Sequence, residues 1–276
     1  MTQVAGSGVL LADSVTDLKA ATARGRLVAC GSHGGEFSGR FADYVGVAGI
    51  VFNDAGIGLD AAGIAGVDLL ARSGRPAAAV GHDSARIGSA GDTLAASVRH
   101  VNTAAARLGC RAGDSVAHVL ELMGKGEAPK PTAGCDRPHE HRSMVGDDML
   151  RVWAVDSASL VREGDIGTIV VTGSHGGLVG GRADRALRVD ALGAVFNDAG
   201  GGRDGAGWSR LPALDNRSIP AATVSAASAH IGSGLSTHRH GVLSHVNETA
   251  VRLGVEPGMT TLDFIDLVAK IRSKGH

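Results

Sequence analysis

An internal repeat constrains this chain more than any other feature: two polar, glycine-rich motifs each occur once in either half, in the same order. Residues 27–35 read LVACGSHGG and are matched by IVVTGSHGG at residues 169–177. Residues 51–56 read VFNDAG and are matched by the same letters at residues 195–200. The nearly constant offset predicts two half-chain units of one fold. Because polar residues recur together with the apolar ones, the repeat indicates function as well as core packing.

The repeat extends over most of the chain. Residues 76–88 are matched by 220–232, and residues 10–14 are answered by 153–157. His100-Val101-Asn102 returns as His245-Val246-Asn247, after a one-residue insertion in the second half. The two units are therefore expected to superpose over residues 8–110 and 151–255.

Length and composition narrow the class of protein. A chain of 276 residues with a formal net charge of −1 and 3% aromatic residues has neither the basic field nor the stacking surface of a nucleic-acid binder. The first residues lack the basic start of a signal peptide, and no apolar run reaches membrane length. Three cysteines at non-equivalent places argue against a disulfide framework. We therefore expect a cytoplasmic protein with no membrane or nucleic-acid partner; a homo-oligomer remains open.

Short apolar runs alternate with amphipathic stretches, which is typical of an α/β fold built from βαβ units. The repeat predicts internally duplicated βαβ units with mostly parallel sheets, in two halves related by a pseudo-twofold axis. Strands are predicted at Val9–Ala12, Arg26–Cys30, Gly49–Phe52 and Ala77–Gly81. Helices are predicted at Asp92–Leu108, at its counterpart through residues 242–253, and at Thr261–Arg272.

The domain organisation follows from a change of composition in the middle of the chain. Residues 125–131, KGEAPKP, have the composition of a linker. We predict a first α/β repeat over residues 1–123, a linker over 124–147 and a second repeat over 148–276. Two small sheets and two halves of one larger sheet both fit this pattern.

The polar motifs all follow predicted strands, where ligands of parallel α/β sheets bind. In Gly-Ser-His-Gly-Gly the imidazoles of His33 and His175 are candidate acid–base catalysts. The surrounding loop is predicted to bind substrate or an anion through its backbone N–H groups. The alternative is a tight turn in which the histidine only bonds a carbonyl. The loop residues predicted to contact substrate are Ser32, Gly34, Gly35, Ser174, Gly176 and Gly177.

The second motif supplies an amide and a carboxylate in each half. Asp54 and Asp198 are predicted to orient the catalytic histidines, or to bind a metal. Asn53 and Asn197 are predicted to bond a substrate carbonyl or oxyanion. The alternative for all four is an Asx turn that caps the next helix.

A third candidate region is the loop after the fourth strand. Arg86 is predicted to clamp a carboxylate or phosphate, with Ser84 and its counterpart Ser228 beside the substrate. A surface salt bridge is the alternative for Arg86, whose counterpart is His230. His82-Asp83 is replaced by Ala226-Ala227, so the halves have diverged here.

No metal or cofactor is predicted. Every lysine lies outside the repeated motifs, which argues against Ser-Lys, Schiff-base and Walker-type chemistry. Cys30 is more typical of a buried structural cysteine than of a nucleophile. Cys135, His139 and His141 have zinc-ligand types but supply only three ligands within the linker.

Together these residues predict an enzyme for a small polar or anionic substrate, with a hydrolase of an amide, ester or ring C–N bond favoured. One alternative is an isomerase, racemase or lyase that uses the paired histidines on two faces of its substrate. Another is a protein that binds a small anion without transforming it. One half alone, or both halves together, could form the working site.

Overall fold

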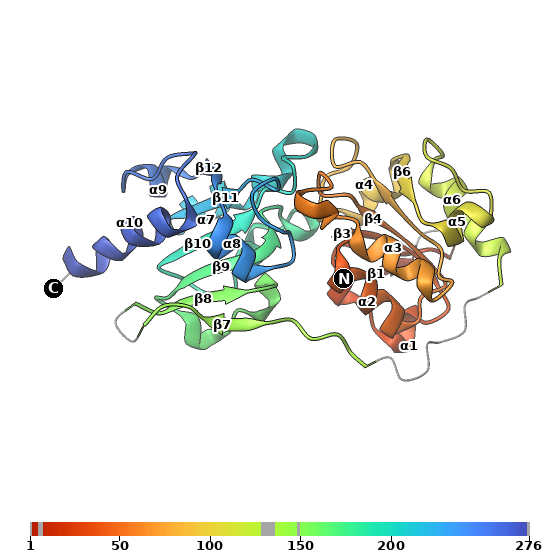
Figure 1. Cartoon of the computed structure of the whole chain (residues 1–276), viewed down its shortest axis with the longest axis horizontal. Helices are drawn as coiled ribbons and strands as arrows, with labels where there is room; N and C mark the ends of the chain where they lie inside the picture. The colour runs from red at the N-terminus through yellow and green to blue at the C-terminus, as the bar shows by residue number, and fades with distance from the viewer. Residues whose placement is uncertain (1, 5–7, 128–135, 148–149, 275–276) are drawn as a thin grey trace.

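Each half of the chain forms a six-stranded sheet, and the two sheets have the same strand order. The two halves lie side by side (Figure 1). The computed structural model describes residues 2–4, 8–127, 136–147 and 150–274. The first sheet has the order β1 (Thr2–Val4), β2 (Leu10–Ala12), β3 (Leu27–His33), β4 (Gly49–Asn53), β5 (Ala77–Val80) and β6 (Val98–Val101). The second has the order β7 (Arg142–Met144), β8 (Val152–Val155), β9 (Ile169–His175), β10 (Gly193–Asn197), β11 (Ala221–Val224) and β12 (Leu243–Val246).

The four central strands of each sheet are parallel and both edge strands are antiparallel. This confirms the predicted α/β class with mostly parallel sheets, and it resolves the open alternative in favour of two separate sheets. The equal strand order is what the repeat predicts, and an origin by duplication stays an interpretation of the sequence.

Helices cover the sheets and are mostly short. The α-helices are α1 (Ala20–Ala23), α2 (Glu36–Val45), α3 (Ala65–Arg72), α4 (Ala90–Ala95), α5 (Thr103–Arg107), α6 (Val116–Lys125), α7 (Arg210–Asp215), α8 (Gly234–His240), α9 (Glu248–Val251) and α10 (Thr261–Lys274). The 3-10 helices are η1 (Val15–Asp17), η2 (Leu59–Ala61), η3 (Ala158–Leu160), η4 (Glu163–Asp165), η5 (Val179–Gly181), η6 (Ala183–Arg185) and η7 (Arg203–Trp208).

Each sheet lies between two apolar layers, because its central strands are apolar on both faces. In the first half, α2 and α3 pack on one face of the sheet and α6 packs on the other. In the second half, α10 packs on one face, with Phe264 and Val268 fully buried. The opposite face is covered by α7 and by an irregular segment over residues 178–192.

The predicted helix Asp92–Leu108 is wrong in its middle, and so is its second-half counterpart. Residues 98–101 form the edge strand β6, which pairs antiparallel with β5. Asn102 then caps α5 by accepting a hydrogen bond from the backbone N of Ala105. The apolar spacing suited a helix, but pairing with the exposed edge of β5 satisfies the backbone groups of this segment instead. The predicted helix at Thr261–Arg272 is confirmed as α10.

The predicted linker is partly ordered structure. Helix α6 ends at Lys125, and β7 lies within residues 124–147 as an edge strand of the second sheet. Residues 136–141, which precede β7, run from the first half to the second (Figure 1). Arg137 in this segment stacks over Phe41 of α2, so the segment contacts both halves.

The two halves meet through the glycine turns that follow β4 and β10. A Cβ atom on Gly56 would lie 2.8 Å from the Cα of Gly200, and the reciprocal distance is also 2.8 Å. Leu59 donates its backbone N–H to Ala226, and Arg203 donates its own to His82. These are matching positions in the repeat, so each half binds the other through the same surface. Apolar residues fill the contact: Ala55, Ile87, Ala199, Ala206 and Ile231.

The close approach of α2 to α3 gives a test of the packing. A Cβ on Gly39 would overlap the backbone of Gly66, so Gly39→Ala should lower the free energy of unfolding by about 1–3 kcal/mol. Gly91→Ala is the matched control, because its Cβ would meet only the Ser89 hydroxyl at 4.0 Å. It should leave stability unchanged or raise it by up to about 1 kcal/mol. Equal urea midpoints for the two variants would contradict the helix contact.

Candidate functional site

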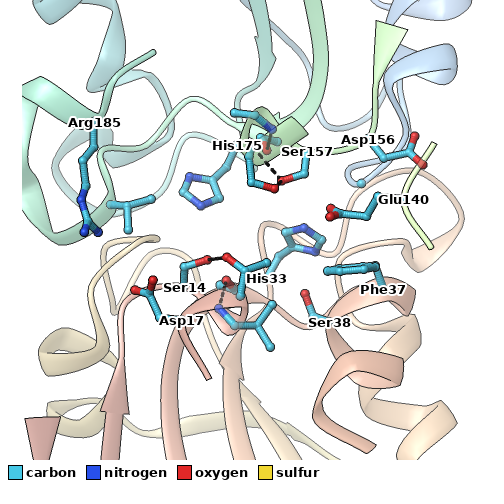
Figure 2. A pocket seen from close by; sticks show the side chains of 18 of the residues that line it. Ser14, Asp17, His33, Phe37, Ser38, Glu140, Asp156, Ser157, His175 and Arg185 are labelled. Atoms are coloured by element: carbon cyan, nitrogen blue, oxygen red, sulfur yellow. Dashed lines mark hydrogen bonds between the residues drawn. The ribbon is translucent and has the colours of Figure 1, made fainter. Parts of the chain in front are cut away.

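A cavity of about 430 Å³ lies between the two halves, at the carboxyl ends of β3 and β9 (Figure 2). Both halves and the segment before β7 line it. The lining residues of the first half include Ser14, Thr16, Asp17, Ser32, His33, Phe37 and Ser38. Those from the rest of the chain include Glu140, Asp156, Ser157, Ser159, Ser174, His175, Asp184, Arg185, Arg188 and Arg210.

His33 and His175 face this cavity from opposite sides (Figure 2). Each is the last residue of its strand, so the strand ends bring both imidazoles to one space. The predicted pair of catalytic histidines thus lies together in a single cavity made by both halves. Of the two arrangements left open by the sequence, the geometry favours one shared site.

The protonation of both histidines is fixed by the glycines that follow them. The backbone N–H of Gly35 donates to Nδ1 of His33 at 3.1 Å, and that of Gly177 donates to Nδ1 of His175 at 3.2 Å. A nitrogen that accepts a hydrogen bond carries no proton, so the neutral ring is protonated at Nε2. Each Nε2–H is therefore a donor, whereas Nδ1 is already engaged.

Burial keeps both imidazoles neutral. It lowers the pKa of His33 from 6.5 to about 4. It also lowers the pKa of His175 far below its usual range, and the charges of Arg210 and His33 add to this effect. His175 is only 7% exposed, so water stabilises a proton added to its ring poorly. At neutral pH the pair therefore acts as two uncharged N–H donors.

Arg210 is a buried cation in the wall of the cavity. It is 4% exposed and donates to the carbonyl oxygens of Gly177 at 2.9 Å and Ala186 at 2.5 Å. Its guanidinium also lies over the ring of Phe196, 5.1 Å from the centroid. Burial lowers the pKa of Arg210 to about 10, which leaves it charged at neutral pH. Among the described residues no carboxylate forms an ion pair with it, so this wall is suited to an anion.

Two more arginines line the cavity, and both belong to a segment that differs between the halves. The first half has the ten-residue helix α2 after its Ser-His motif, whereas the second half has only the 3-10 turns η5 and η6. This irregular segment, residues 178–192, places Arg185 and Arg188 at the cavity. The positive charge of the cavity therefore belongs to the second half.

Glu140 supplies an ionisable carboxyl group on the other side of the cavity (Figure 2). Burial raises its pKa to about 7; the nearby charge of Asp156 raises it further, against a hydrogen bond with Ser157 that lowers it. A carboxyl group with a pKa near neutrality exchanges protons readily at physiological pH. Of the described groups in the cavity, Glu140 is the one suited to proton transfer.

The two serines of the Ser-His motifs, Ser32 and Ser174, have structural hydrogen bonds. The hydroxyl of Ser32 accepts the backbone N–H of Val15 at 2.9 Å, and that of Ser174 accepts the N–H of Ala158 at 2.9 Å. These bonds tie the loop after β2 to β3 and the loop after β8 to β9. No hydrogen bond within the described part of the chain joins Ser32 or Ser174 to a histidine. Neither Ser32 nor Ser174 is therefore paired with a histidine as a nucleophile.

The expected pairing of aspartates with these histidines requires correction. Asp54 lies away from the cavity and accepts from the backbone N–H groups of Gly56 and His82. It also contacts Nδ1 of His82 at 3.0 Å and Arg99 at 3.3 Å. Asp198 likewise accepts from Gly200 and Ala226. The turn after each strand directs these carboxylates to the backbone of the neighbouring loop, as in the Asx-turn alternative.

The remaining candidates also have structural partners. Asn53 and Asn197 are fully buried and bridge the backbone of neighbouring loops. The hydroxyls of Ser84 and Ser228 donate to backbone carbonyls three residues earlier. Arg86 is half-exposed and forms a bidentate salt bridge with Asp92, which is the alternative considered for it.

The glycine loops do not offer free N–H groups to an anion. The N–H groups of Gly34 and Gly176 donate to the carbonyl oxygens of Asn53 and Asn197. Those of Gly35 and Gly177 are used by the histidine rings, as described above. The glycines instead allow close packing: a Cβ on Gly35 would lie 2.6 Å from Nδ1 of His33.

Several cavity residues were missed by the sequence analysis. Ser14 and Ser157 are the serines of the repeated Asp-Ser dipeptide, which the repeat places at this edge of the sheet but which was not predicted to contact substrate. Arg210 replaces Gly66 of the first half, and Glu140 lies in the predicted linker, so neither carries a repeat signal. Only the folded arrangement reveals them.

In the described residues, no cluster of three His, Cys, Asp or Glu side chains could hold a metal ion. His139 and His141 are described, but Cys135 lies outside the described residues. Cys30 is buried, and burial raises its pKa to about 12. Across the described ranges no helix has both the length and the apolar character needed to cross a membrane.

Comparison with protein-family models, with curated proteins and with solved structures found no significant match. The site is therefore interpreted from its geometry.

The depressed histidine pKa values predict a dependence of stability on pH. As the pH falls below 6.5, His33 of the unfolded chain becomes protonated, whereas His33 of the folded chain stays neutral down to about pH 4. The free energy of unfolding should therefore decrease over this interval, by up to about 1.4 kcal/mol per pH unit for each imidazole. Above pH 6.5 this contribution disappears.

Urea unfolding of the wild type and of His33→Asn at pH 7 and pH 5 measures the His33 part. The variant keeps an acceptor for the Gly35 N–H and removes the titrating ring, so its stability should fall less between the two pH values. A fall equal to that of the wild type would contradict the depressed pKa of His33.

Proposed function

We propose that the cavity between the halves is the active site of a hydrolase for a small carbonyl compound that carries an anionic group. The single observation that supports it most is the pair of neutral Nε2–H donors, His33 and His175, that face one space beside the buried, unpaired Arg210. Preorganised donors of this kind stabilise an oxyanion as it forms. The substrate class is an amide, an ester or a ring with a C–N bond.

The proposed reaction uses water directly. Glu140 as carboxylate accepts a proton from a water molecule, whose oxygen forms a bond to the substrate carbonyl carbon. The electron pair of the carbonyl moves to its oxygen, and the imidazole N–H groups bind that oxyanion. Collapse of the intermediate breaks the C–N or C–O bond, and Glu140 returns the proton to the leaving nitrogen or oxygen. Its pKa of about 7 suits both transfers.

The arginines have a separate role in this proposal. The buried guanidinium of Arg210 binds the anionic group of the substrate, and exposed Arg185 and Arg188 attract it to the cavity. No covalent intermediate is invoked, since the hydroxyls of Ser32 and Ser174 already accept backbone hydrogen bonds.

A small-anion-binding protein is the second candidate. It is favoured by the same uncharged donors, because a group that neither gains nor loses a proton can hold an anion without reacting with it. An isomerase based on the two histidines fits the geometry less well, since Nδ1 accepts a backbone N–H and Nε2 carries the proton in both rings. Neither ring nitrogen is then free to act as a base.

A panel of small carboxylate-bearing amides, lactams and esters, followed by NMR, tests the hydrolase. We expect turnover of at least one compound, and Glu140→Gln should reduce kcat about a hundredfold to ten-thousandfold. Arg210→Met should mainly raise KM, because it removes the cation that holds the anionic group. Arg86→Met is the matched control, since Arg86 is in a surface salt bridge, and it should leave the kinetics unchanged. Saturable binding with full recovery of every compound would instead identify a binding protein. If no compound is turned over and none is bound, both candidates are contradicted.

Two substitutions at His33 separate its donor from its acceptor. In His33→Gln the side-chain amide can replace the Nε2–H donor, and in His33→Asn the amide oxygen can replace Nδ1 as the acceptor for Gly35. We expect His33→Asn to lose about a hundredfold to a thousandfold in kcat, as for other oxyanion donors. The Gln variant should keep more activity but lose about 1 kcal/mol of stability. The reverse order of activities would contradict the donor role.

A further inference from the structure

A second cavity, of about 580 Å³, lies at the contact between the halves and is separate from the histidine cavity. Its wall combines the glycine turn of the first half with the loop after β11 of the second. Its lining residues include Gly56, Asp60, Asp198, Gly200, Ser225 and Ala226. Two carboxylates belong to this wall, and none of its lining residues is basic.

The equivalent place in the first half is occupied by the protein's own cations. Asp54, which is 1% exposed, contacts Nδ1 of His82 at 3.0 Å and Nη1 of Arg99 at 3.3 Å. The guanidinium of Arg99 also pairs with Asp83 at 2.6 Å. A buried carboxylate is thus neutralised by an imidazole and a guanidinium from its own half.

The second half keeps the carboxylate and loses both cations. Asp198 is only 7% exposed, and its Oδ1 accepts from Gly200 and Ala226, as Oδ1 of Asp54 does from Gly56 and His82. His82 is replaced by Ala226 and Arg99 by Ser244. Within the described part of the chain, no side chain forms a hydrogen bond or ion pair with Asp198, and its Oδ2 accepts no hydrogen bond. Its charge interacts with the imidazole of His245, whose pKa burial lowers. The shortened side chain of Ala226 forms part of the cavity wall in front of it.

We propose that this second cavity binds an organic cation, an ammonium or guanidinium group, whose charge is neutralised by Asp198. The charged group of the ligand takes the place that the His82 ring occupies beside Asp54 in the first half, so the fold itself shows the chemistry that this position accepts. A buried carboxylate stabilises a bound cation because the opposite charges and a charge-assisted hydrogen bond offset the loss of hydration of both groups. The other carboxylate of the wall, Asp60, pairs with His230 at 2.7 Å. A metal ion fits less well, since the described residues bring no third ligand to this place.

This cation site is independent of the proposed hydrolase, because it shares no lining residue with the histidine cavity. The experiment is a calorimetric titration of the full chain with methylguanidinium chloride, with urea as a neutral molecule of similar shape. The wild type should bind methylguanidinium saturably and urea far more weakly. Asp198→Asn keeps an oxygen for the backbone bonds but removes the charge, and it should weaken binding about tenfold or more.

A graft of the first-half imidazole tests the position of the ligand. The variant Ala226→His should fill the space in front of Asp198, abolish methylguanidinium binding and raise the melting temperature. Asp83→Asn is the matched control, because it removes an exposed carboxylate from the first half and should leave the affinity unchanged. Methylguanidinium binding no better than urea, or unchanged affinity in both Asp198→Asn and the graft, would overturn the proposal.

Discussion

The contact between the two glycine turns determines how the rest of the molecule is arranged. Gly56 and Gly200 approach so closely that neither position has room for a Cβ atom, and both have positive φ. The bonds from Leu59 to Ala226 and from Arg203 to His82 join matching positions of the repeat. One surface thus binds its own counterpart, as in the isologous interface of a twofold dimer. With this contact made, the carboxyl ends of β3 and β9 are brought to face each other.

The facing strand ends explain why one cavity contains two histidines with the same chemistry. Each ring is held by the glycine two residues later in its own strand-end turn, so the proton is directed to Nε2 in both halves. Burial then makes a charged form unfavourable, and the neighbouring Arg210 adds to this for His175. A pair of uncharged donors beside a buried cation is an environment for negative charge, whether the charge is permanent or develops during a reaction.

The sequence predicts the buried strands and the repeated motifs. The directions of the side chains and the contacts between distant segments are known only from the structure. The buried strands were predictable because short apolar runs bounded by glycine have few alternatives, and the two histidines because their motif occurs twice. The segment 92–108 was mispredicted because its apolar spacing fits a helix, while its backbone is satisfied at the edge of β5. The directions of Asp54 and Asp198 depend on turns whose geometry the sequence does not reveal. Arg210 and Glu140 have no counterpart in the repeat, so only folding brings them to the cavity.

Two of the differences between the halves lie on the cavity walls and change the charge of those walls. The buried asparagines and the backbone bonds to Asp54 and Asp198 are kept in both halves. In contrast, α2 is replaced by a segment that brings arginines to the histidine cavity, and His82 is replaced by Ala226 at the second cavity. The replacement of α2 adds cations to the cavity that contains the two N–H donors. The replacement of His82 leaves the buried carboxylate of Asp198 without the imidazole partner that Asp54 has. A twofold framework with such opposite changes is suited to recognising a positive and a negative group at two separate places.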